Sequence, residues 1–242
     1  MPGLVNGVIL RLTFRATMGR RRALLFALPA VILIAVAAVL TATARSGSWQ
    51  AEFLGNFGFS VVLPLTALII GTSVLGAEID DGSIVHLLAT PVPRSQVVLS
   101  KFVVAAALTI VFGAVPEYLA AAIAKGPASG LAVGLLAGAL TASVLYNAVF
   151  VMLSVLTTRA IAVGLLYLVV WEGLLANLVP AVKLLSVSQY SLSVANSIAH
   201  YPALHAHLTL GTAVGLAVLV TAAALVICTR RLSRFSITGD AS

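Results

Sequence analysis

Residues 78–101 read EIDDGSIVHLLATPVPRSQVVLSK and separate two long apolar runs. Three of the seven acidic residues of the chain fall in the first four positions of this stretch, which we call the central loop. A charged segment of this length cannot stay in hydrocarbon. The central loop must therefore lie at or outside a membrane surface, between two membrane-spanning segments.

Local signals within the central loop predict a short helix that lies along the membrane surface. Asp81-Gly82-Ser83 is a turn and helix-start signal, and the mostly apolar piece 84–88 follows it. Pro91 and Pro93 stop any helix, and Ser95 can cap a new helix that continues into the next apolar run. A surface helix held between two spans in this way suits docking to a partner.

Composition excludes a soluble domain, because 61% of the residues are hydrophobic, 9% are charged and the mean hydropathy is +1.13. The net charge of +7 does not indicate a nucleic-acid partner, since the basic residues sit at the ends of apolar runs and form no basic domain. One cysteine, Cys228, excludes an internal disulfide and a cysteine-based metal site. The excess of arginine over lysine, eleven to three, points to a GC-rich bacterial genome.

The apolar runs predict an all-α, polytopic membrane protein with one transmembrane domain, residues 1–242. A hydrocarbon core about 30 Å thick needs roughly 20 apolar residues per helix. Six runs meet this requirement, and a short polar loop, residues 45–56, joins the first two. The expected spans are residues 23–44, 57–77, 102–124, 131–157, 161–179 and 208–228.

The N-terminal segment, residues 1–22, predicts an amphipathic helix in the membrane interface, with arginines facing anionic lipid headgroups. The alternative is a positively charged anchor without an ordered helix. The residues of the apolar face are Val5, Val8, Ile9, Leu12 and Ala16, and the basic residues beside it are Arg11, Arg15 and Arg22.

Six spans put both termini on one side of the membrane, and the basic residues predict which side. Lysine and arginine accumulate on the cytoplasmic side. With the N-terminus inside, eleven of the fourteen basic residues lie inside, and only Arg45, Lys125 and Lys183 lie outside. We therefore expect both termini and the central loop on the cytoplasmic side of a bacterial plasma membrane.

No catalytic motif accompanies this layout. None of the three lysines is followed by serine or threonine, so the chain lacks the phosphate-cradling loop of an ATPase. The sequence also lacks Gly-x-Ser-x-Gly and His-Glu-x-x-His, and His200, His205 and His207 lack zinc-site spacing. We expect neither an enzyme nor a bound metal or cofactor.

The central loop resembles the loop between the second and third spans of permease subunits in type-2 ABC transporters. The resemblance covers the layout of the whole chain, and residue by residue only this loop. The matching residues are Glu78, Gly82, Ser83, Leu87, Leu88, Pro91, Arg94 and Lys101.

The resemblance implies that the central loop carries a coupling helix, which Glu78, Asp80, Asp81 and Arg94 hold or orient. This helix touches a separate ATPase, which binds the ATP and magnesium. A second copy, or a similar permease, completes the pathway. We expect an exporter of a hydrophobic or amphipathic drug, antibiotic or lipid. The alternatives are an ion-coupled secondary transporter that uses Glu172, and a membrane anchor for a soluble partner.

Glu117 and Glu172 are the only acids inside apolar runs, where a carboxylate is costly and is by default a functional candidate. Glu117 lies near the outer end of its span, where we expect it to reach water. Glu172 lies mid-span after Trp171, with Asn177 further along. Three roles stay open for Glu172: lining a transport path, binding a cation, or making a structural hydrogen bond.

Gly130, Gly134 and Gly138 repeat at intervals of four in the expected fourth span. Small residues at this spacing let helix backbones approach closely. Packing within one subunit and contact between subunits are the two interpretations. Before the last span, residues 184–198 predict a weakly amphipathic outer helix, although residues 190–194 alternate as a strand would.

Overall fold

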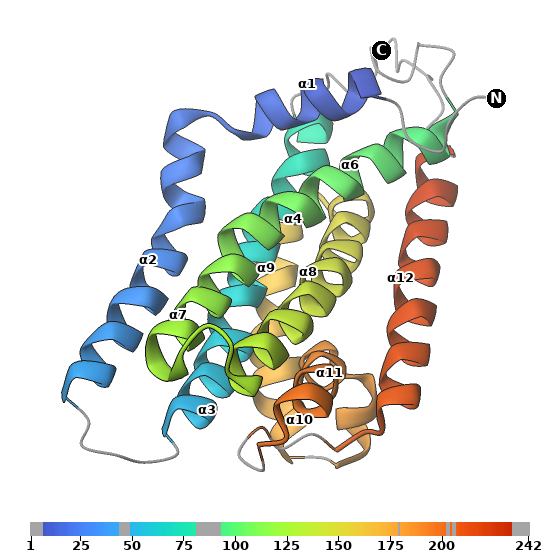
Figure 1. The fold of residues 1–242 in the computed structure, drawn as a ribbon. Coiled ribbons are helices and arrows are strands. Elements are labelled where there is room, and N and C mark those ends of the chain that lie inside the picture. The colour runs from blue at the N-terminus through green and yellow to red at the C-terminus, as the bar shows by residue number, and fades with distance from the viewer. Residues whose placement is uncertain are drawn as a thin grey trace, which may run out of the picture.

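The computed structural model describes residues 7–43, 49–80, 93–178, 180–201, 204 and 207–233, and within these ranges all regular structure is helical (Figure 1). A helix satisfies its own backbone hydrogen bonds, which an apolar chain in lipid requires. In chain order the helices are α1 (Gly7–Thr17), α2 (Arg20–Thr43), α3 (Trp49–Phe53), η1 (Leu54–Val62), α4 (Leu63–Asp80), α6 (Arg94–Thr109), η2 (Ile110–Ala114), α7 (Val115–Lys125), α8 (Gly130–Leu156), α9 (Ala160–Leu166), η3 (Tyr167–Leu175), α10 (Ala176–Leu178), η4 (Pro180–Leu185), α11 (Val187–Ala199) and α12 (Leu210–Ser233).

Five helices in the described part are long and apolar enough to cross a membrane, where the sequence predicted six spans. The expected fifth span, residues 161–179, is a shorter apolar helix, Ala160–Leu175, whose second half is π-helical. The helical backbone continues through α10 to Leu178, close to the expected end of this span. The five long helices are Ala23–Thr43, Trp49–Gly76, Arg94–Lys125, Gly130–Leu156 and Leu210–Ser233.

One of the expected boundaries is wrong, because packing extends a helix beyond its apolar run. The polar loop expected at residues 45–56 is helical from Trp49 onward, and there Ala51 and Leu54 are buried in the core. The helix of the third span begins at Arg94, one residue from the start predicted at Ser95, and continues into the expected apolar run. Pro93 has an extended backbone conformation that starts this helix, and the residues that follow bury one face against α4.

The helix α8 lies at the centre of the bundle, where it contacts α4, α6, α7, α11 and α12. Figure 1 shows α2 on one side of this centre and α12 on the other. Both outer helices are mostly exposed: 22% of α2 and 17% of α12 is buried within the apolar window of each, against 67% for α8. Their exposed apolar side chains are suited to contact with lipid.

The N-terminal helix α1 lies crosswise over one end of the bundle and packs on α6 (Figure 1). Only part of its predicted apolar face is buried. Ile9 is buried in the protein, whereas Val8 and Leu12 are exposed. Thr13 shares the buried side with Ile9. The exposed pair leaves apolar surface beside Arg11 on the outside of this helix.

The segment before the last long helix forms η4 and α11. Residues 190–194, which alternate in sequence as a strand would, are helical in α11. This helix packs along α8 at the glycine stripe. A Cβ at Gly134 would come within 2.5 Å of the Ala195 carbonyl oxygen, and one at Gly138 within 2.6 Å of the Ser191 carbonyl oxygen. Gly130 lies at the edge of the same contact. The stripe therefore serves close packing of α11 on α8 within one subunit.

Candidate functional site

The two helices that flank the central loop, α4 and α6, meet at the end of the bundle that α1 covers (Figure 1). Glu78 and Asp80 lie in the last turn of α4, where only the backbone is described, and Arg94 is the first residue of α6. The remaining candidate residues of the central loop lie outside the described residues. They are Asp81, Gly82, Ser83, Leu87, Leu88 and Pro91.

Lys101, the last residue of the central loop, is buried and not at the surface. Its side chain is 1% exposed, and its Nζ donates a hydrogen bond to the Val74 carbonyl oxygen at 3.0 Å. Leu75 of α4 and Val97 of α6 belong to the same buried cluster as Val74. A buried ammonium needs such partners, because desolvating a charge is costly. Lys101 therefore joins α4 to α6 near the ends of the two helices that flank the central loop.

Arginines gather at this end of the bundle. Arg159, in the turn after α8, lines a pocket with Gly76 of α4, and Arg230 of α12 lines another with Ser95 of α6. Arg11 of α1 is exposed at the same end. The basic residues described at the opposite end are Lys125 and Lys183. The central loop thus emerges on the more basic end of the molecule.

Glu172 is buried in η3, where it accepts four hydrogen bonds. Oε1 accepts from Tyr167 Oη at 3.0 Å and from the Val187 backbone N–H at 2.8 Å. Oε2 accepts from Ser186 Oγ at 2.6 Å and from Ser188 Oγ at 2.7 Å. Val187 begins α11, so the carboxylate caps this helix at its positive end.

The four donors offset the cost of burying the Glu172 carboxylate, because hydrogen bonds to a carboxylate are stronger than those between neutral groups. Among the three roles left open by the sequence, this geometry favours the structural hydrogen bond. Trp171 Nε1 donates to the Leu185 carbonyl oxygen at 3.4 Å, so it contacts the same segment. The side chain of Asn177 is not described. Sequence reasoning missed Ser186, although a serine directly before an apolar helix is an N-cap signal.

Glu117 does not reach water, contrary to expectation. Its side chain is 0% exposed, and neither carboxylate oxygen has a hydrogen-bond partner among the described residues. Gly58 in η1 lies directly against this carboxylate: a Cβ at that position would overlap both oxygens. Buried polar groups without a partner are rare and mark a site under functional or structural constraint.

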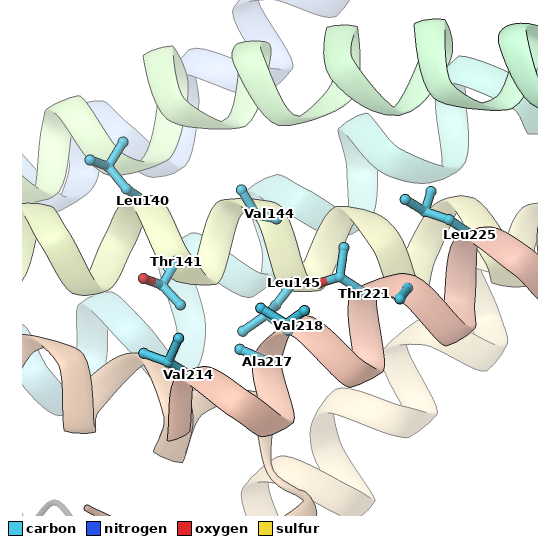
Figure 2. A pocket seen from close by; sticks show the side chains of 10 residues that line it. Leu140, Thr141, Val144, Leu145, Val214, Ala217, Val218, Thr221 and Leu225 are labelled. Atoms are coloured by element: carbon cyan, nitrogen blue, oxygen red, sulfur yellow. The ribbon is translucent and has the colours of Figure 1, made fainter. Parts of the chain in front are cut away.

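An apolar groove runs between α8 and α12 (Figure 2). Its volume is about 580 Å³, and its polar groups are two threonine hydroxyls, on Thr141 and Thr221. Exposed side chains such as Val144 of α8 and Val218 of α12 form its walls. A groove of this kind can hold an apolar molecule or the acyl part of an amphipathic one. The lining residues are Leu140, Thr141, Val144, Leu145, Val214, Ala217, Val218, Thr221, Ala222 and Leu225.

Metal-ligand residues do not cluster in the described part of the chain, where no group of three or more His, Cys, Asp or Glu could hold an ion. His200 is exposed at the end of α11, and His207 Nε2 lies 3.0 Å from Lys183 Nζ. Cys228 is buried in α12.

Comparison with known protein families matches residues 18–180 to the family described as ABC-2 family transporter protein. A search of curated proteins gives no match. The matched range contains the central loop, Lys101, Glu117 and Glu172, and it ends before α11 and α12.

Proposed function

We propose, from the premise that the chain belongs to the ABC-2 transporter family, that it is the permease subunit of an exporter driven by a separate ATPase. The ATP and magnesium belong to that ATPase. The proposal rests on the family and on one observation, the junction of α4 and α6 through Lys101.

This junction supports a docking role for the central loop. A partner that moves the loop moves the ends of α4 and α6 together, because Lys101 and the apolar cluster around it hold the two helices as one body. Packed helices transmit such displacements as rigid-body motions. Glu78, Asp80, Asp81 and Arg94 are the residues proposed to orient the docking helix.

The proposed substrate is hydrophobic or amphipathic: a drug, an antibiotic or a lipid. The apolar groove between α8 and α12 supports this class, since apolar side chains line it and it carries little polarity. A second copy of the chain, or a similar permease, would complete the pathway. The ion-coupled alternative receives no support from Glu172, whose carboxylate is committed to four donors.

The proposed location is a bacterial plasma membrane with both termini and the central loop in the cytoplasm. The arginines gathered at the end of the bundle where α1 lies support this orientation. The exposed Val8 and Leu12 of α1 support contact of that helix with the membrane interface.

Charge reversal at the central loop tests the proposal. We expect Glu78→Lys to abolish transport and stimulation of the co-expressed ATPase, while the permease still inserts into the membrane. Glu52→Lys is the matched control, because Glu52 is an exposed acid in α3 at the opposite end of the bundle. Normal assembly and unchanged transport in both Glu78→Lys and Arg94→Glu would refute the docking role.

A further inference from the structure

A pocket with both apolar and charged lining lies at the end of the bundle where the central loop begins, between α2, α4, α9 and the end of α8. Its volume is about 600 Å³, within the range of ligand-binding pockets. Among its lining residues Phe26 and Thr72 are buried, whereas Leu25, Ile161 and Leu165 are exposed. A molecule outside the protein can therefore reach its apolar side chains.

The hydroxyl groups that α4 and α8 contribute to the pocket do not need a ligand. Each donates a hydrogen bond to a backbone carbonyl oxygen of its own helix. The three side chains are Thr72, Ser73 and Ser154, with donor–acceptor distances of 2.6, 2.8 and 2.8 Å. Because these donors are already satisfied, this part of the pocket suits an apolar chain better than a polar molecule.

Arg159 is the one charged side chain that lines the pocket in the described part of the structure. It is exposed in the turn between α8 and α9, so a ligand can reach it. Arginine binds phosphate oxygens through paired N–H donors. No acidic side chain among the described residues lines the pocket to compete for this guanidinium.

The charge and the apolar surface follow one another along the bundle. Leu165 lies nearly two helical turns beyond Arg159, and on α4 Ile69 lies about two turns before Gly76. Apolar lining therefore extends from the arginine at the end of the bundle toward its middle. A phospholipid has the same order of parts, with a charged headgroup at the membrane surface and acyl chains below it.

We propose that this pocket binds an anionic phospholipid from the leaflet on the side of the central loop. Arg159 holds the phosphate, and one acyl chain lies along Leu25, Ile69 and Leu165. Basic pockets between membrane helices favour lipid headgroups with a net negative charge. Occupancy of this site can be measured without the ATPase and without transport, so it is independent of the docking role of the central loop.

Native mass spectrometry of the full-length chain, released from nanodiscs with equal amounts of phosphatidylglycerol and phosphatidylcholine, tests the headgroup. Phosphatidylglycerol should be retained about fivefold more than phosphatidylcholine, as expected for one basic side chain near a membrane surface. Arg159→Gln should abolish this preference. Arg231→Gln is the matched control, because Arg231 is an exposed arginine at the same end that does not line the pocket.

Filling the pocket tests the acyl chain. Ala162→Phe adds a ring from an exposed position of α9 that lines the pocket, and it should lower retention of both lipids severalfold. Ala223→Phe, at an exposed position of α12 outside this pocket, is the matched control and should leave retention unchanged. Melting temperatures show whether each variant is folded.

Three results would overturn the proposal. One is equal retention of the two lipids by the wild-type chain. Another is an equal loss of preference in Arg159→Gln and Arg231→Gln, which would show that only the overall charge attracts the lipid. The third concerns a second copy of the chain, whose presence the same spectra show: conversion of a dimer to a monomer by Ala162→Phe, with lipid retention unchanged, would place that copy in the pocket.

Discussion

Glu172 connects two segments of the chain through a single carboxylate. Its four donors come from η3, from the residue that precedes α11 and from the first turn of α11, so the acid fixes where the outer helix begins. The cost of burying the charge is offset locally, by hydroxyls and by the positive end of a helix. No ion needs to bind for this carboxylate to be stable.

Glu172→Gln should lower the melting temperature while ATP-dependent transport persists at least in part. The amide keeps the shape but loses the charge, and hydrogen bonds to charged groups contribute about 1.5–3 kcal/mol each. Collapsing the proton gradient should have little effect on wild-type transport. Loss of all transport in Glu172→Gln, together with wild-type transport that needs no ATPase, would favour an ion-coupled transporter instead.

Gly58→Ala should destabilise the protein by about 1–3 kcal/mol, because the new Cβ overlaps the carboxylate of Glu117 and the packed core cannot absorb it freely. Gly215→Ala is the matched control, since nothing lies within 4 Å of the Cβ that it would add. Thermal unfolding in detergent measures both. In a Glu117→Ala background, Gly58→Ala should lower the free energy of unfolding by a smaller amount. If the losses of the two single variants simply add in the double variant, the two residues do not interact.

The sequence singled out Glu117 and Glu172 as acids inside apolar runs, but it did not predict that Glu117 is buried or what surrounds either acid. Gly58 is far from Glu117 along the chain, and the donors to Glu172 come partly from α11. Such contacts depend on how helices pack, which local patterns do not encode. Ser186 was missed as well, although a serine at the position before a helix is a local signal.

At the scale of helices, the junction of α4 and α6 can be tested by removing its charge while keeping its volume. Lys101→Met loses the hydrogen bond to Val74, and we expect ATPase stimulation and transport to fall several-fold. The melting temperature should change little, since replacing a buried charge by an apolar side chain is often neutral. Lys125→Met should leave transport unchanged, and an equal loss in both variants would contradict a coupling role for Lys101.

The apolar runs predicted that the long helices exist, and the structure differs mainly at their ends. The helix that begins at Trp49 and the one that begins at Arg94 both extend through polar residues, because their inner faces are buried against neighbouring helices. Hydropathy measures average apolarity and does not register a helix with one buried face.

For the whole molecule, the sequence predicted the all-helical membrane class and the basic end, because these follow from composition and charge. Labelling of single cysteines in a Cys228→Ala background tests the orientation. A cysteine at Ser129, between α7 and α8, should react from outside the cell, and cysteines at Ser83 and Ser236 only after permeabilisation. External labelling at Ser83 would place the central loop on the wrong side for an ATPase.

The short helix Ala160–Leu175 has a consequence for the surrounding lipid. Leu166, Val169 and Leu174 are exposed along it, yet it has fewer residues than the long helices beside it. One bilayer thickness cannot match both this helix and its longer neighbours, and the cost grows with each ångström of hydrophobic mismatch. Acyl-chain length would then tune the protein, and reconstituted transport should be faster in shorter-chain lipid than in longer-chain lipid.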